Sequence, residues 1–377
     1  MTPAQLSRTV LHAVRRAVEE GALRVPVPER VPVERARPGG CGDYASSVAL
    51  KLARSAGLPP RTVAEILQNR VAGLPGIDRV EITGPGFLNF TLARAGHREL
   101  VRAVRSAGIR YGHGAVLAGT RVRFAATDEL RADLVTRTAV RLLASQGAVA
   151  CVASGEGEPP RERERLSAEQ PPSEREPLSA REAPSVREAL SEPERLIVVP
   201  VPAGAGDVVA RLGSDAARWA LLRPAAHDVP DLDPHRLLAQ REANPLFRIR
   251  YAHARTRALL RNARDLGFQP DTGAGSGAQT LTASYADPRE AALIALLADY
   301  PRVLEAAARH RAPDRLARHL EATADAFFRC HDACPPLPRG EQKPSAAHRA
   351  RLALADAAGA VLAGGLSLLG ISAPDIL

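Results

Sequence analysis

Hydrophobic residues recur with two different periods along this chain, and the change of period separates a mixed first part from a helical second part. The spacing predicts helices at 6–18, at 45–56 and from Pro60 onward, with Gly57 as the stop between the last two. Between Val80 and Leu92 the period becomes two on either side of a Gly-Pro-Gly turn. These features predict a small α+β domain that ends in a β-hairpin.

From Gly206 to the end the pattern is helical, interrupted by short Pro or Gly signals and a Gly/Ser/Ala loop at 271–280. Such a pattern fits an all-α bundle, so the expected fold is mainly α behind a small α+β N-terminal domain. The predicted helices span 213–224, 234–243, 245–266, 287–310, 312–332 and 345–370.

Residues 154–195 differ from both parts. They contain 11 Glu, 7 Arg and 7 Pro, no aromatic residue, and a 12-residue repeat. A segment with so few apolar residues does not bury enough surface to offset the entropy of ordering, which predicts a disordered linker. The segment has a net charge of −4. Because the whole chain has a net charge of +9, the residues outside the segment carry +13.

Of the 51 basic residues, 49 are arginine. Arginine makes planar, bidentate contacts with phosphates and base edges, which makes nucleic acid a candidate partner. A GC-rich coding sequence would produce the same bias, so the positions of the arginines must decide.

The apolar stretch Leu352–Ile371 is long enough to suggest a membrane helix. It also contains Asp356 and four glycines, so we expect a buried bundle helix and no membrane association. Four cysteines in a chain of this length do not make a disulfide framework, and we expect a cytoplasmic protein.

The most informative pattern is the helix predicted at 245–266, with Asn244 as its cap and Pro245 in its first turn. Its faces separate into an apolar stripe, an arginine stripe within about 60° of arc, and a mixed face that includes aromatic residues. The apolar stripe is Ile249, Ala252, Thr256, Leu259, Leu260 and Ala263; the arginine stripe is Arg250, Arg257, Arg261 and Arg264; the mixed face is Asn244, Phe247, Arg248, Tyr251 and Arg255. The arginine stripe predicts phosphate contacts, and Tyr251 with Phe247 predicts base stacking, whereas a solvated helix face is the alternative.

The predicted hairpin supplies a second candidate surface. The outward face of its second strand would present Phe87 and Asn89, an aromatic ring and an amide suited to an unstacked RNA base. The alternative is that a neighbouring helix covers Phe87.

Signals for other chemistry are weak. Cys330-His331-Asp332-Ala333-Cys334 is an incomplete and poorly oriented metal-ligand set, so we expect packed cysteines and no metal site. No residue spacing predicts a catalytic triad, and no catalytic residue is assigned.

These segments resemble arginyl-tRNA synthetase at both ends of the chain. Gly42-Asp43-Tyr44-Ala45 and the run from Val80 to Phe90 are similar to the N-terminal additional domain of that enzyme. Asp215-Ala216-Ala217-Arg218, Asn244-Pro245-Leu246-Phe247 and Tyr251-Ala252-His253-Ala254-Arg255 are similar to the entry of its DALR-type anticodon-binding bundle, a similarity that continues to Ile371.

The resemblance implies that the partner is tRNA. It places Phe87, Asn89 and Phe90 toward the D-loop, and Tyr251, Arg255 and the terminal segment near Leu369 toward the anticodon. The complete anticodon-side prediction is Asn244, Phe247, Arg250, Tyr251, Arg255, Arg257, Arg261, Arg264 and Leu369. Arg248 and Arg250 replace residues that are commonly Tyr and Gln in the family, so the anticodon preference is open.

The class I catalytic core of that family is not intact. Two βαβ halves need well over about 150 residues, whereas 103 residues separate Leu92 from Leu196 and 42 of these form the linker. The His-x-Gly-His signature is absent, and no lysine lies between Lys51 and Lys343 to stabilise phosphates. Residues 122–128 and the predicted helix 129–145 resemble the first strand and helix of the core without their chemistry.

The sequence therefore predicts a non-catalytic, monomeric tRNA-binding paralogue with no cofactor. The alternatives are an ATP-dependent arginine–tRNA ligase, alone or with a protein partner, and a protein-interaction scaffold. The predicted parts are an N-terminal-like α+β domain (1–110), a remnant of the core (111–153), the linker (154–195) and the core exit with the DALR-like anticodon-binding helix bundle (196–377).

Overall fold

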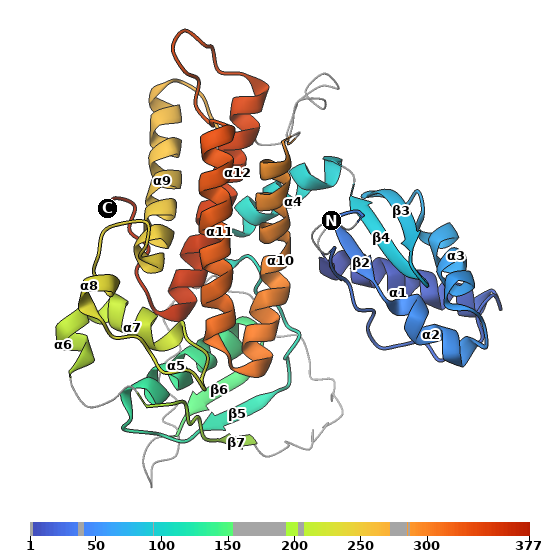
Figure 1. The fold of residues 1–377 in the computed structure, drawn as a ribbon, viewed down its shortest axis with the longest axis horizontal. Coiled ribbons are helices and arrows are strands. Elements are labelled where there is room, and N and C mark those ends of the chain that lie inside the picture. Colours follow the sequence, from blue (N-terminus) through green and yellow to red (C-terminus); the bar gives the residue numbers. More distant parts are fainter. Residues whose placement is uncertain are drawn as a thin grey trace, which may run out of the picture.

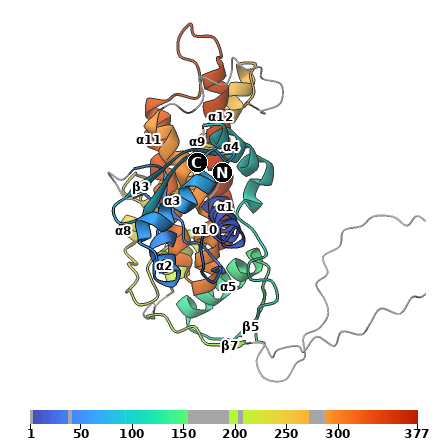
Figure 2. The ribbon, with the colours of Figure 1, turned by 90° about the vertical axis from the view of Figure 1, so that its right-hand side faces the viewer.

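A computed structural model describes residues 3–36, 41–92, 94–153, 194–202, 207–271, 285 and 287–377 of the chain. The linker predicted at 154–195 lies outside these residues except for its last two, and the loop predicted at 271–280 lies outside them except for Asp271. The fold is mainly α, as expected, with a small domain beside a helix bundle and a short sheet at one end of the bundle (Figures 1 and 2).

The small N-terminal domain packs three helices on a four-stranded antiparallel sheet with strand order β1-β2-β4-β3. Its elements are α1 (Pro3–Glu19), β1 (Glu34–Arg35), β2 (Tyr44–Ser46), α2 (Val48–Ala56), α3 (Pro60–Val71), β3 (Ile77–Thr83) and β4 (Phe87–Leu92). The predicted hairpin is confirmed as β3 and β4, and Gly57 ends α2 in the left-handed conformation. The helix predicted to include residue 45 begins instead at Val48, because Tyr44–Ser46 pairs with β4 as a strand.

The turn between β3 and β4 requires glycine. Gly86 has a φ of 149°, and a Cβ there would lie 2.8 Å from the carbonyl oxygen of Pro60. This close approach holds the hairpin turn, and with it Phe87, against the first turn of α3.

The middle of the chain forms a short parallel sheet with strand order β6-β5-β7. Its elements are β5 (Arg121–Phe124), α5 (Leu130–Ser145), β6 (Val149–Val152) and β7 (Glu194–Leu196). The strand and helix predicted from the resemblance are therefore present as β5 and α5. The helix before them, α4 (Arg94–Ala107), and the short 3-10 turn η1 (Gly108–Arg110) pack against the bundle, and the apolar core of the N-terminal domain ends at Leu92.

The C-terminal part is the predicted helix bundle (Figure 1). It contains α6 (Val208–Leu212), α7 (Ser214–Leu222), α8 (Pro234–Leu237), α9 (Pro245–Asp265), α10 (Pro288–His310), α11 (Pro313–Ala333) and α12 (Ala346–Leu369). The helix predicted at 234–243 stops at Leu237. The Asn244 amide donates to the carbonyl oxygens of Leu237 and Ala239. These oxygens therefore bind the cap residue of α9 instead of the backbone N–H groups that would extend α8.

Helix α12 is long and apolar enough to cross a membrane, but 78% of its most apolar window is buried inside the fold. Two of its glycines allow close packing. A Cβ at Gly364 would lie 2.5 Å from the carbonyl oxygen of Ile109, and one at Gly365 would lie 2.5 Å from Leu320 Cδ2. The long apolar stretch is thus the central helix of the bundle, as its glycines indicated.

Candidate nucleic-acid interface

Helices α9 and α11 present a ladder of three aromatic rings. The ring of Tyr251 stacks on Phe247 with centroids 5.8 Å apart and an interplanar angle of 5°, and on Phe328 at 5.5 Å and 20°. These separations are those of offset stacks. Tyr251 remains 43% exposed although it contacts both neighbours, so part of its surface is available to a ligand.

Two arginines border this ladder. The guanidinium of Arg248 lies 4.9 Å from the centre of the Phe328 ring and donates from Nε to Asp325 at 2.5 Å. Nε of Arg255 lies 3.4 Å from Nε2 of His331. A pocket of about 420 Å³ opens beside Arg248, lined by Glu242, Ala243, Pro245, Arg248, Ile249, Glu321, Ala324 and Asp325. The site therefore combines aromatic rings for stacking with arginine side chains and carboxylates.

The predicted apolar stripe of α9 is buried, with Leu260 at its edge as the partly exposed exception. The arginine stripe lies opposite, but it is not a free phosphate ridge. The last residues of the chain run along it. Arg257 Nε lies 3.2 Å from the carboxylate of Asp375, and both Nη atoms of Arg261 approach the Asp375 carbonyl oxygen at 3.4 and 3.5 Å. Arg264 is exposed and has no ion pair to the described residues.

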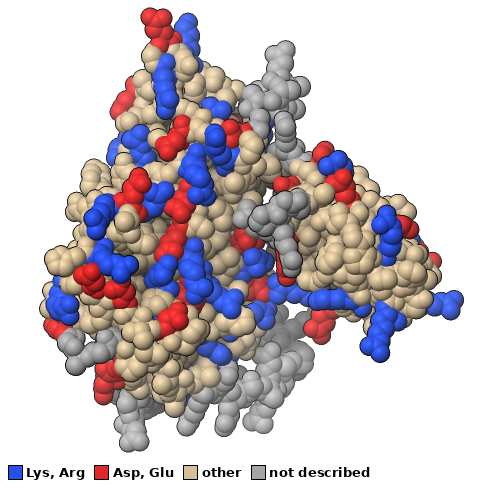
Figure 3. Space-filling model, viewed as in Figure 1, with Lys and Arg blue, Asp and Glu red and all other residues tan. Residues whose placement is uncertain are grey.

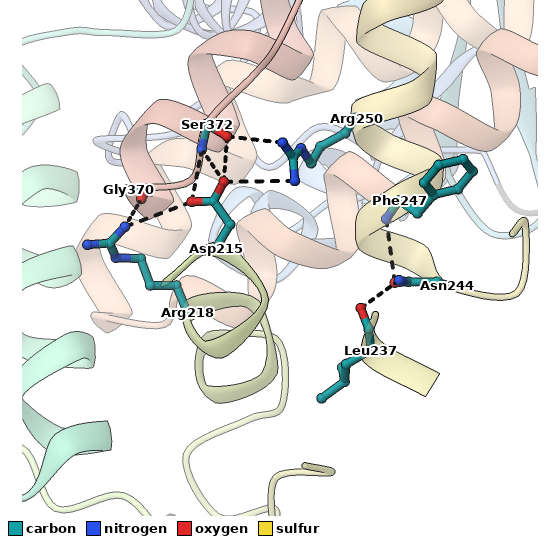
Figure 4. Close-up of polar contacts among 8 residues, drawn as sticks. All are labelled: Asp215, Arg218, Leu237, Asn244, Phe247, Arg250, Gly370 and Ser372. Carbon is teal, nitrogen blue, oxygen red and sulfur yellow. Dashed lines mark hydrogen bonds and ion pairs between the residues drawn. The ribbon is translucent and has the colours of Figure 1, made fainter. Parts of the chain in front are cut away.

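Arg250 belongs to a polar anchor for the same terminal segment (Figure 4). Its Nη1 lies 3.9 Å from Asp215 of α7, and its Nη2 donates to Ser372 Oγ at 3.3 Å. Asp215 also accepts from the backbone and hydroxyl of Ser372, and Arg218 donates to the Gly370 carbonyl oxygen at 2.8 Å. The Asp-Ala-Ala-Arg motif therefore fastens the chain end to α7 and α9.

His253 contributes a further contact to this segment. Its Nδ1 lies 3.0 Å from the Pro374 carbonyl oxygen, which a neutral imidazole donates to when Nδ1 carries the proton. Burial lowers the pKa of His253 from its ordinary value, while the contact with Pro374 opposes that shift. The neutral ring therefore helps to hold the chain end against α9.

Two residues predicted on the anticodon side are structural instead. Asn244 is buried and caps α9, accepting from the backbone N–H groups of Leu246 and Phe247 (Figure 4). Leu369 is fully buried at the end of α12. Neither side chain faces solvent. Asn244 caps the first turn of α9, and Leu369 packs in the core at the end of α12.

The hairpin surface is smaller than the sequence suggested. Phe87 is 39% exposed, as expected for an outward ring. Asn89 is buried and donates to the Thr83 hydroxyl at 2.8 Å across the hairpin, and Phe90 is fully buried in the domain core. The expectation that these two face an RNA is corrected, which leaves Phe87 beside the glycine turn.

Charge on the bundle is mixed. In the view of Figure 3, arginine and acidic side chains alternate over the helices and do not form one uniform basic face. Many of these arginines pair with carboxylates of the same or a neighbouring helix, as Arg223 does with Glu321 at 2.9 Å. The arginine bias of the sequence therefore overstates the free positive charge.

The carboxyl end of the short parallel sheet is the place where open α/β sheets bind ligands. Here the first helix after β5 is capped by its own chain, because the carboxylate of Glu129 accepts from Ala132 N at 2.6 Å. A helix N-terminus is a ready site for phosphate, and in α5 a carboxylate occupies it.

Arg131, the second residue of α5, is fully buried. Its guanidinium donates to five backbone carbonyl oxygens at 2.7 to 3.3 Å, those of Val201, Leu221, Pro224, Ala225 and Asp228. Burial lowers its pKa. These contacts tie α5 to Val201, which follows β7, and to the end of α7 with the residues after it.

The Cys330–Cys334 segment is packed. Both thiols are buried, and burial raises the pKa of Cys330 to about 12. His331 contacts Arg255 and Asp332. No group of three or more metal-ligating side chains occurs in the part of the chain that the structure describes.

Three residues of these sites escaped the sequence reasoning. Phe328 had a detectable signal, since an adjacent Phe pair with a following His sits on the helix predicted at 312–332. Glu129 and Arg131 had none, because their partners come from distant segments or from the backbone.

Comparisons with known proteins match both ends of the chain. Residues 5–92 match the arginyl tRNA synthetase N terminal domain, and residues 249–377 match the DALR anticodon binding domain. Arginine–tRNA ligases of Frankia alni and Renibacterium salmoninarum are 29% and 27% identical, in alignments of 555 and 554 positions that cover all of this chain and all of each ligase. Since the chain has 377 residues, at least 178 positions of the first alignment hold no residue of it.

Solved structures show the same fold. The arginyl-tRNA synthetase of Thermus thermophilus has a TM-score of 0.66 at 17% identity, covering 100% of both chains. That of Plasmodium falciparum has a TM-score of 0.66 at 9% identity, covering 100% of this chain and 99% of its own.

Proposed function

Because this chain is an arginyl-tRNA synthetase-related protein with both recognition domains of that group, we propose that it binds tRNA without ligating arginine to it. The observation that carries the binding half is the exposed Tyr251 in the ladder of α9 and α11, bordered by Arg248 and Arg255. Aromatic rings beside arginines are the usual surface for unstacked RNA bases.

Three observations support the absence of catalysis. The sequence lacks His-x-Gly-His and has no lysine between residues 51 and 343. The alignment with a ligase leaves at least 178 positions empty. The N-terminus of α5 is capped by Glu129, and Arg131 in its first turn is committed to backbone carbonyl oxygens. A phosphate at that helix end would meet a carboxylate at close range.

In this proposal residues 1–110 and 196–377 carry recognition, 111–153 is what remains of the core, and 154–195 joins the parts. The contacts to Ser372 and Asp375 mean that much of the arginine stripe binds the chain end and is not free for phosphates. Arg264 and the exposed part of Arg257 are left for phosphates. We propose a monomeric, cytoplasmic protein that needs no cofactor.

The binding half is tested by the affinity of labelled tRNA for the wild type and for two variants. Tyr251→Ala removes the central ring, and loss of one stacked base costs about 1–3 kcal/mol, roughly 5- to 150-fold in Kd. Tyr251→Phe keeps the ring and serves as the matched control, with a Kd close to that of the wild type. Equal affinity of the alanine variant and the wild type would remove this ladder as the binding site.

The ligase alternative has one specific point in its favour, namely that relatives aligned over their full length are named ligases. Arginine-dependent ATP–pyrophosphate exchange separates the two functions. We expect no exchange above a no-protein blank, with or without tRNA. Exchange that depends on arginine would establish catalysis and overturn the proposal.

A further inference from the structure

The N-terminal domain has a basic groove that none of the predicted sites includes. It lies between α1 and α3, which pack side by side in the domain apart from the bundle (Figure 1). Its volume is about 460 Å³. Its polar lining consists of Gln5, Arg8, Thr9, His12, Arg16 and Arg70, above an apolar floor.

The spacing on α1 gives the groove a line of donors. Arg8, His12 and Arg16 are four residues apart, so they stand above one another on one face of the helix. All three are exposed. Arg8 and Arg16 are two turns apart, about 12 Å along the helix axis, so they reach different anionic groups and not a single one.

The charge of the groove is only partly neutralised. Glu20 is its acidic neighbour, and Arg70 lowers the pKa of Glu20 by donating to its carboxylate at 2.6 and 3.0 Å. Arg16 shares the same carboxylate at 3.3 Å, whereas Arg8 makes no ion pair among the residues that the structure describes. Three arginines against one carboxylate leave a net charge of +2.

The groove is also distinct from the Phe87 surface. The hairpin turn rests on Pro60 at the first turn of α3, while Arg70 lies in the last turn. The ten residue steps from Pro60 to Arg70 span about 15 Å of helix. An elongated ligand is therefore needed to engage both places at once.

We propose that this α1–α3 groove binds the phosphodiester backbone of an RNA at two or more phosphates. The proposal rests on the tRNA binding proposed above and adds to it a second, sequence-independent contact. Spaced guanidinium groups over an apolar floor are suited to a chain of phosphates, since each contact releases counterions and needs no base.

The test is the salt dependence of tRNA binding by the full chain. Arg8→Ala/Arg16→Ala removes two phosphate contacts and should reduce the slope of log affinity against log salt by about two. The matched control is Arg15→Ala/Arg54→Ala, which removes the same charge from exposed helix positions that do not line the groove. We expect the control to keep the wild-type slope, and thermal unfolding checks that both variants are folded.

The outcomes separate this proposal from the previous one. Hydroxyl-radical footprints of bound tRNA should lose one protected stretch in the groove variant and a different stretch in Tyr251→Ala. A groove variant with the slope and footprint of the control overturns the groove and leaves the ladder intact. A wild type that retains neither tRNA nor polyuridylate at low salt overturns both proposals.

Discussion

Single residues decide how the short parallel sheet and α5 are joined to the rest of the chain. Arg131 uses a buried guanidinium to bind five carbonyl oxygens of the segment 201–228, and Glu129 places a carboxylate at the start of the same helix. Both residues serve the fold at a position where related folds hold a ligand. Arg131 therefore holds α5 to the segments that lead into the bundle.

Replacing Arg131 should expose this role. Arg131→Met keeps much of the side-chain volume but removes a buried donor that five carbonyl oxygens share, at a cost of about 3 kcal/mol in the free energy of unfolding. Urea unfolding measures it. Arg137→Met is the control on the same helix, since Arg137 is exposed and pairs with Asp133 at the surface, where little change is expected. Equal stability of the two variants would contradict the role given to Arg131.

His253 should make the stability depend on pH. Burial lowers its pKa in the folded chain, so below about pH 6.5, the ordinary value, the unfolded chain binds more protons than the folded one. Stability rises with pH wherever the unfolded state binds more protons, so the free energy of unfolding should fall as pH drops through that range.

His113 and His348 also have lowered pKa values and add to the same trend. The contribution of His253 to the pH dependence of the free energy of unfolding is therefore measured as the difference between the wild type and His253→Gln. The Gln amide has a donor for the Pro374 carbonyl oxygen. The variant should show the shallower pH dependence in urea unfolding. Parallel curves would show that His253 has no part in it.

At the scale of elements, the sequence predicted where the helices lie. It did not predict which segments pack against their polar faces. The period of the apolar residues predicted α9 to within one residue and its buried stripe, including Thr256. It did not reveal that the segment after Gly370 returns to the arginine stripe, because that contact depends on tertiary packing of residues 114 or more positions apart. The buried Asn89 was missed for a similar reason, since its partner Thr83 lies across the hairpin turn.

The chain end should compete with RNA phosphates for the arginine stripe. Asp375→Asn removes the carboxylate that pairs with Arg257 and frees one more cation for RNA. We expect tighter tRNA binding at low salt and a slope of log affinity against log salt that is steeper by about one. Ser367→Ala, an exposed substitution on α12, is the control. Weaker binding by Asp375→Asn would show instead that the seated chain end is needed for recognition.

At the scale of the whole molecule, the chain keeps the two ends of an arginyl-tRNA synthetase-related fold and a three-stranded sheet between them. The length of 377 residues and the missing signatures already pointed to this arrangement. The structure adds that Glu129 caps α5, that Arg131 binds backbone carbonyl oxygens of distant segments, and that Tyr251 on α9 is partly exposed. The proposed function therefore combines tRNA recognition with the absence of arginine ligation.

One assay measures both halves of that claim on the same sample. The full chain is incubated with ATP, labelled arginine and differently labelled tRNA, then filtered to count tRNA retained by the protein and, after protein removal, arginine attached to tRNA. We predict retention of tRNA that weakens as salt is raised, with no arginine attached above the blank. Arginine attached to tRNA, or tRNA not retained even at low salt, would contradict the account.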